Sequence, residues 1–89
     1  MLEHSAEIIN KLGLHARAAA KFVTTASQFE SEIELGFNGN QVNGKSIMGV
    51  MLLAAARGAV VHIAIDGPDE EQASEALLNL INNRFDEPE

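Results

Sequence analysis

The first half of the chain shows two patterns of apolar residues. Residues 2–9 alternate loosely between apolar and polar side chains, and residues 32–37 alternate cleanly, which is typical of strands with one face in water. Between them, the apolar residues of 16–27 recur at intervals of three and four, which predicts an amphipathic helix. The Asn-Gly pair at 38–39 predicts a tight hairpin, because a type I′ turn needs positive φ at both positions. A return strand through Val42 is expected to complete it.

The second half of the chain predicts two helices separated by a strand. Ser46 is suited to cap a helix that runs to Arg57, with Gly58 as its stop. Residues 59–66 alternate again and predict a strand. Asp69 is expected to cap a last helix, whose apolar stripe consists of Ala73, Ala76, Leu77, Leu80 and Ile81.

The predicted elements follow one another in the order βαββαβα. Because strands with glutamate at alternate positions keep one face in water, we expect a single four-stranded antiparallel sheet with all three helices on its other face. The predicted fold is therefore an α+β, open-faced βαββαβα sandwich. We expect one domain over residues 1–89, in which residues 84–89 form a frayed, solvated tail.

The charge of the chain excludes several classes of partner. Thirteen acidic and six basic residues leave a formal net charge of −7. A nucleic-acid-binding protein needs a basic face to neutralise phosphates, and this chain has too few cations to build one. Tyrosine and tryptophan are absent, so a platform for stacking bases is not expected either.

The residue types that are missing limit the chemistry further. The chain has no cysteine, which excludes a disulfide scaffold, thiolate zinc sites and cysteine nucleophiles. We find no apolar signal core and no stretch long enough to span a membrane, so we expect a cytoplasmic protein without membrane insertion. The three histidines, His4, His15 and His62, are not at metal-ligand spacing, and we predict no metal and no cofactor. His4 and His62 are expected to be ordinary surface residues.

His15 stands immediately before the first turn of the first predicted helix. A helix start presents unpaired N–H groups and a positive dipole end, which together bind anions, and Arg17 adds a planar cation for phosphate oxygens. The same positive field keeps a ring nitrogen unprotonated and nucleophilic. This arrangement suits reversible capture of a phosphoryl group, and Gly13 is expected to allow close approach of a partner's backbone or phosphate. The alternative is that His15 only caps the helix.

A second candidate site surrounds Ser46. Serine is a favoured N-cap, which alone explains its place, although a phosphate there would also lie at a helix N-terminus. In the helix that follows, Ile47, Met48 and Met51 cannot all be buried in a two-layer fold. Exposed methionine and isoleucine beside a reactive site are typical of an adaptable docking patch. The alternative is an ordinary core with scattered surface residues.

Two blocks of sequence carry a resemblance to a known family. The first block, at the start of a predicted helix, is Gly13-Leu14-His15-Ala16-Arg17. The second is Gly44-Lys45-Ser46-Ile47-Met48-Gly49-Val50-Met51, followed by Leu53-Ala54-Ala55 and Gly58. With the same order of elements over residues 5–85, the chain closely resembles HPr, the family of histidine phosphocarriers of the bacterial phosphoenolpyruvate-dependent phosphotransferase system.

The resemblance implies that His15 accepts a phosphoryl group from enzyme I and passes it to enzyme IIA domains. The chain would then be a stoichiometric carrier with a covalent phosphohistidine, and not a turnover enzyme. It also implies that Arg17 stabilises the phosphoryl group and that Ser46 is the position modified, in some bacteria, by an HPr serine kinase/phosphorylase. The implied partner surface consists of Ala16, Ala20, Ile47, Met48 and Met51. Transient docking of this kind favours a monomer.

The chain departs from many family members at several positions. Ala18 stands where many have proline, and Thr24 and Ser27 replace lysines, so apolar contact should matter more than charge in docking. The acidity of the chain and the ending at 83–86 are also similar to those of the nitrogen-related paralogue, a regulatory carrier. Two alternatives therefore stay open, that paralogue and an interaction module controlled by phosphorylation of Ser46.

Overall fold

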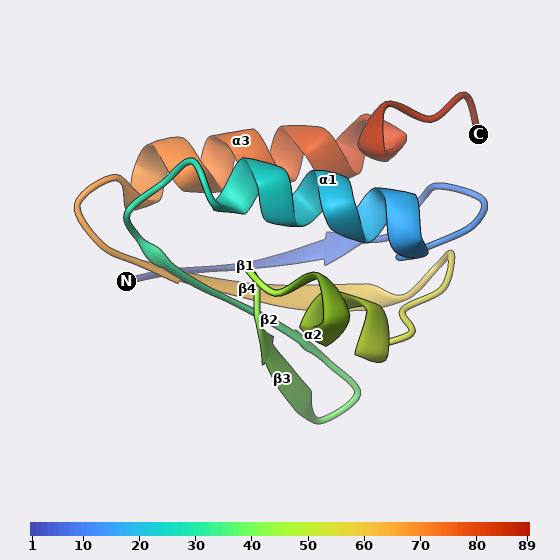
Figure 1. Cartoon of the computed structure of the whole chain (residues 1–89), viewed down its shortest axis with the longest axis horizontal. Coiled ribbons are helices and arrows are strands. Elements are labelled where there is room, and N and C mark those ends of the chain that lie inside the picture. Colours follow the sequence, from blue (N-terminus) through green and yellow to red (C-terminus); the bar gives the residue numbers. More distant parts are fainter.

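Four strands and three helices follow one another in the predicted order in the computed structural model, which describes all 89 residues (Figure 1). The elements are β1 (Leu2–Glu7), α1 (Ala16–Ala26), β2 (Glu32–Phe37), β3 (Asn40–Asn43), α2 (Ile47–Leu52), β4 (Val60–Asp66) and α3 (Glu70–Asn82), with a final 3₁₀ turn, η1 (Arg84–Asp86). The strands form one sheet in the order β1-β4-β2-β3, and every neighbouring pair is antiparallel. The predicted open-faced α+β sandwich is confirmed.

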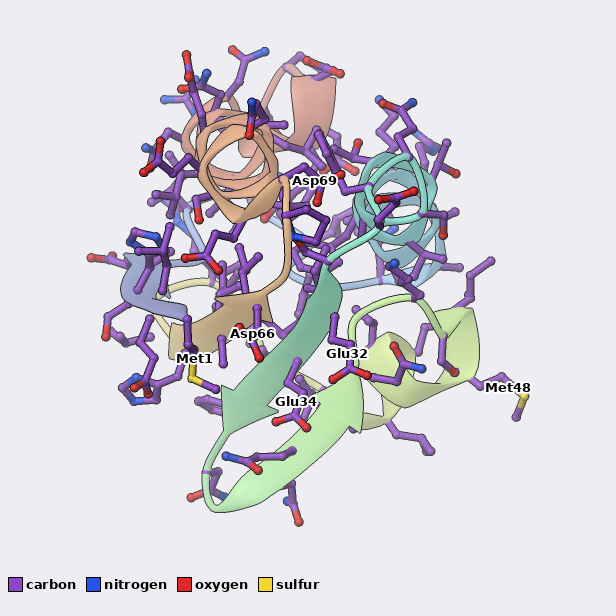
Figure 2. All side chains as sticks on the ribbon, turned by 90° about the vertical axis from the view of Figure 1, so that its left-hand side faces the viewer. Met1, Glu32, Glu34, Met48, Asp66 and Asp69 are labelled. Atoms are coloured by element: carbon purple, nitrogen blue, oxygen red, sulfur yellow. The ribbon has the colours of Figure 1, made fainter.

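The helices cover one face of the sheet and leave the other open, with α1 and α3 side by side (Figures 1 and 2). Leu35 of β2 pairs with Ile63 of β4, and both belong, with Phe22 of α1, to one continuous core of twenty buried apolar residues. Glu34, one position before Leu35, is exposed on the open face, as the alternating pattern predicts. No helix in this fold has the length and apolar character that crossing a membrane requires.

Most predicted boundaries agree closely with the structure. The helix predicted over 16–27 ends at Ala26, and the strand predicted over 59–66 begins at Val60. The predicted hairpin is present, with φ of 54° at Asn38 and 83° at Gly39. These elements were predictable because each follows from local periodicity or from one turn motif.

The second helix is shorter than predicted. The sequence predicts that it runs from Ser46 to Arg57, but α2 ends at Leu52, and Ala54 has a positive φ of 52°. The reason is that the following backbone serves another loop: the Ala55 carbonyl accepts a hydrogen bond from the Leu14 N–H over 2.9 Å. The backbone after Leu52 therefore holds the segment that leads into α1 and does not continue the helix.

The carboxyl-terminal segment is ordered, in contrast to the frayed tail predicted for residues 84–89. Phe85 is fully buried in the core, and the Lys21 ammonium donates a hydrogen bond to the Phe85 carbonyl over 2.8 Å. Arg84, Phe85 and Asp86 have φ values of 56°, 53° and 62°, a left-handed turn that reverses the chain after α3. The prediction was wrong because one apolar residue among polar ones gives no periodic signal.

Asp69 occupies the predicted N-cap position of α3 but does not cap it with its side chain. Its carboxylate instead accepts hydrogen bonds from the backbone N–H groups of Glu30 and Ser31 and from the Ser31 hydroxyl, over 2.8, 3.0 and 2.5 Å. Figure 2 shows Asp69 at the start of α3, facing the connection between α1 and β2. The residue therefore joins two connections that are far apart in the sequence.

Candidate functional site

His15 is the N-cap of α1, at the place where an extended backbone becomes helical. Its φ of −74° and ψ of 179° are extended, and its carbonyl accepts the first helical hydrogen bond, from the Ala19 N–H over 2.8 Å. Its ring nitrogen Nδ1 accepts a hydrogen bond from the Arg17 N–H over 3.3 Å. Nδ1 therefore lies among the free N–H groups of the first helical turn, which form an anion site.

The other ring nitrogen of His15 faces a carboxylate. Nε2 lies 2.5 Å from Oε2 of Glu87, and the Glu87 side chain is only 8% exposed, against 25% for His15. Because an ionised carboxylate can only accept a hydrogen bond, Nε2 carries the ring proton and donates a hydrogen bond to Glu87. Nδ1 then keeps its lone pair, which is consistent with its role as acceptor from Arg17.

Glu87 is held in the ionised form that this arrangement needs. Burial raises the pKa of its carboxyl, but hydrogen bonds from Asn10 and His15, together with the positive charge of Arg17, outweigh burial and lower the pKa below its usual value. Glu87 was not among the predicted site residues, because it lies in the segment predicted to be frayed. Nothing in the local sequence pattern signals its contact with a residue near the other end of the chain.

Asn10 anchors the loop before α1. It is fully buried, and its amide Nδ2 donates to the Gly13 carbonyl over 2.8 Å and to Oε1 of Glu87 over 3.1 Å. Gly13 has a φ of 67°, and a Cβ there would lie 2.6 Å from the Ala55 carbonyl oxygen. The close approach at Gly13 is therefore to the chain's own backbone, and not to a partner or a phosphate as the sequence analysis expects.

Arg17 is exposed, and its guanidinium makes no hydrogen bond or ion pair within the protein. Since α1 places it two residues after His15, this free cation lies at the same helix start as Nδ1. A neutral imidazole nitrogen with helix N–H groups and a guanidinium beside it can bond to a phosphoryl group and neutralise its oxygens.

Known proteins are similar to this chain in sequence over its full length. A family model described as "PTS HPr component phosphorylation site" matches residues 2–83. The chain belongs to the HPr family. It is 60% identical over 89 residues to the phosphocarrier protein HPr of Neisseria meningitidis, and the match covers 100% of both chains.

Solved HPr structures share the fold of this chain. The crystal structure of HPr-C-His from Thermoanaerobacter tengcongensis matches 100% of both chains with a TM-score of 0.96 at 49% identity. An HPr dimer from the same organism matches 98% of this chain and 100% of its own with a TM-score of 0.78 at 50% identity. This HPr-family chain is therefore a phosphocarrier of the phosphotransferase system.

The surface beside His15 in this HPr-family chain is apolar. In α2, which packs against α1, Ile47, Met48 and Met51 are 44%, 74% and 41% exposed, and Figure 2 shows Met48 pointing away from the protein. Leu52, the last residue of α2, is 77% exposed and was not among the residues predicted for this surface. Leu12, in the loop that leads to His15, is 67% exposed and was also missed. We call the α2 residues Ile47, Met48, Met51 and Leu52 the α2 patch.

The remaining predicted residues fall around the same two helices. Ala16 is exposed and Ala20 is half-buried on α1. Ser46 is the N-cap of α2, and its hydroxyl oxygen accepts a hydrogen bond from the Gly49 N–H over 3.1 Å. The capping role predicted for Ser46 is therefore confirmed, whereas its regulatory role stays a prediction.

The other two histidines lie on β1 and β4, apart from the N-cap of α1. His62 is exposed on the open face of the sheet, with Nδ1 3.1 Å from the Ser5 hydroxyl oxygen. His4 is half-buried, so the expectation that it is an ordinary surface residue is wrong. The alternation of β1 that buries Ala6 and Ile8 also turns His4 inward. No three histidine, aspartate or glutamate side chains converge where they could hold a metal ion.

Proposed function

We propose that Nδ1 of His15 accepts a phosphoryl group from phospho-enzyme I and passes it to an enzyme IIA domain. The observation that carries this proposal is that the two ring nitrogens of His15 have different hydrogen-bond partners. Nε2 is occupied by Glu87, while Nδ1 keeps a lone pair among the N–H groups at the start of α1. Membership of the HPr family supports the same pathway.

The chemistry needs no general base. The lone pair of Nδ1 attacks phosphorus, a nitrogen–phosphorus bond forms, and the bond from phosphorus to the donor breaks with its electron pair leaving on the donor. In the unphosphorylated chain the Arg17 N–H donates a hydrogen bond to Nδ1. After transfer this N–H becomes free to donate to a phosphoryl oxygen. The Arg17 guanidinium then adds charge-assisted hydrogen bonds. Because the site is at the surface, these interactions are weak enough for the group to be passed on.

The partner surface in this proposal surrounds His15 on α1 and α2. Ala16 and Ala20 provide small side chains on α1. The α2 patch, which contains the predicted docking residues Ile47, Met48 and Met51, provides exposed apolar area beside them. Thr24 and Ser27 stand where many family members carry lysines, and Lys21 is the one lysine of α1. Apolar contact therefore supplies most of the docking energy, and attraction between charges contributes little. We propose a monomeric carrier.

Ser46 gives the site a means of control. A phosphate on Ser46, added by an HPr serine kinase/phosphorylase, would bring nearly two negative charges to the edge of the α2 patch. Those charges would disfavour an acidic partner and leave the core unchanged. The same observation favours the second candidate function, an interaction module that binds through the α2 patch under the control of Ser46. A third, the nitrogen-related regulatory carrier, would use His15 in the same way with other partners.

A relay experiment tests the proposed pathway. The chain is phosphorylated with phosphoenolpyruvate and enzyme I, purified, and mixed with an enzyme IIA domain, and the label on each protein is followed. We expect label to leave the chain and appear on the IIA domain. Uptake without onward transfer to any IIA domain would contradict the carrier role, and binding without uptake would favour the interaction module.

A further inference from the structure

We propose that Glu87 is a positioning residue for phosphoryl transfer, which holds the His15 ring in the tautomer whose free lone pair is on Nδ1. This inference rests on the proposed function and adds a residue outside the two sequence blocks of the family. It is carried by a chain of hydrogen bonds that runs from a buried amide through the Glu87 carboxylate to the imidazole.

The two carboxylate oxygens of Glu87 have separate partners. Oε2 accepts from Nε2 of His15 over 2.5 Å, and Oε1 accepts from Nδ2 of Asn10 over 3.1 Å. Asn10 is itself fully buried and fixed by its second hydrogen bond, to the Gly13 carbonyl. The carboxylate therefore has a defined orientation, and it transfers that orientation to the ring.

The backbone on both sides of Glu87 is also fixed. Phe85 is buried before it, and the Lys21 ammonium bonds the Phe85 carbonyl. After it, the Glu89 carbonyl accepts a hydrogen bond from the Lys11 N–H over 2.8 Å. Between α3 and Glu87 the chain adopts three left-handed residues in succession, a conformation that is costly without glycine. The segment is thus held in an unfavourable path that delivers Glu87 to His15.

The charge of Glu87 also matches the charge that develops on the ring. When Nδ1 bonds to phosphorus, the ring takes positive charge while Nε2 keeps its proton, and the donor keeps the electron pair of the broken bond. A carboxylate 2.5 Å from Nε2 stabilises that charge without taking the proton. The same contact operates in reverse when the group leaves for an acceptor.

The test compares Glu87→Ala and Glu87→Gln with the matched control Glu89→Gln. Glu89 belongs to the same segment, but its carboxylate is exposed and pairs with Lys11, not with His15. The first readout is the ¹⁵N NMR signature of the His15 ring, recorded at alkaline pH, where an ordinary imidazole is neutral. We expect the parent and Glu89→Gln to show one tautomer, protonated at Nε2, and Glu87→Ala to show a mixture.

The second readout is the rate of phosphorylation by phospho-enzyme I. We expect Glu87→Ala to lower kcat on the order of tenfold with little change in KM, and Glu87→Gln to lie between, since it keeps an acceptor oxygen and loses the charge. An unchanged tautomer and rate in Glu87→Ala would overturn the proposal, and so would a faster rate, because Glu87 would then obstruct the site. Failure of the parent chain itself to take up a phosphoryl group would count against the proposed function instead.

Discussion

Glu87 lies 72 positions after His15 in the chain, yet its carboxylate accepts a hydrogen bond from the His15 ring over 2.5 Å. The contact joins the start of α1 to the carboxyl-terminal segment, so the site depends on both ends of the sequence. It also distinguishes the two ring nitrogens, because one is engaged by a carboxylate and the other faces the helix N–H groups.

Arg17→Ala is expected to slow phosphoryl transfer without abolishing it. The helix N–H groups remain in this variant, and the guanidinium acts in an exposed position. We therefore expect a loss on the order of tenfold, below the roughly 10²–10³-fold loss when a donor is removed from an enclosed oxyanion hole. Stopped phosphorylation time courses measure it, with the exposed Arg57→Ala as control. Equal rates in both variants would remove Arg17 from the mechanism.

Phe85→Ala is expected to destabilise the whole protein. Phe85 is fully buried, and truncating a buried phenylalanine costs about 3–5 kcal/mol. Urea unfolding measures the change, with Met48→Ala as the control, because the 74% exposed Met48 should change stability by no more than about 0.5 kcal/mol. Similar stabilities for the two variants would mean that the carboxyl-terminal segment is frayed after all.

The sequence predicted the parts of this fold that depend on local pattern. Alternation located the strands, and the pair Asn38 and Gly39 located the hairpin. The helix start after His15 followed from the switch to helical periodicity, and with it the candidate nucleophile. Parts that depend on distant contacts were not predictable. The early end of α2 follows from the hydrogen bond between the Leu14 N–H and the Ala55 carbonyl.

The position of Glu87 also depends on contacts between distant residues, and the local sequence pattern does not predict it. A polar ending with one phenylalanine has no periodicity, and the left-handed turn that directs it contains no glycine. Such a turn forms only because burial of Phe85 and the bond from Lys21 compensate for it. These compensating contacts come from α1, so reading the segment by itself predicts a frayed end.

Asp69→Asn is expected to make the free energy of unfolding depend less on pH in the acid range. The hydroxyl of Ser31 and the N–H of Glu30 hold the pKa of the Asp69 carboxyl below its usual 3.8 in the folded state. The unfolded chain therefore binds the proton at higher pH, and the stabilisation by Asp69 is complete above about pH 4 and is lost as pH falls through the depressed folded pKa. Urea midpoints between neutral and strongly acidic pH measure this.

The control for Asp69 is Glu71→Gln, an exposed carboxylate in the first turn of α3. We expect the parent and this control to lose stability in parallel as the pH falls through the acid range. Asp69→Asn should be less stable than both at neutral pH, and its stability should fall less as the pH is lowered. Parallel curves for all three proteins would show that the contacts of Asp69 with the connection between α1 and β2 contribute nothing.

Ser46→Asp is expected to weaken docking and leave the chemistry at His15 intact. The introduced charge lies beside Ile47 and Met48 in the α2 patch, so the KM for phosphorylation by phospho-enzyme I should rise severalfold while kcat changes little. Aspartate is itself a good N-cap, so stability should be preserved. Ser46→Asn, a neutral capping control, should keep the parent KM. Unchanged kinetics in both would leave Ser46 as a cap only.

The most direct test of the central claim is the intact mass of the chain after incubation with phosphoenolpyruvate and enzyme I. We predict a gain of one phosphoryl group that is lost in acid, absent in His15→Ala and present in the matched control His62→Ala. His15→Ala should remain folded, because the side chain lies at the surface end of α1. A gain that survives in His15→Ala, or one that is stable to acid, would contradict a phosphohistidine at His15.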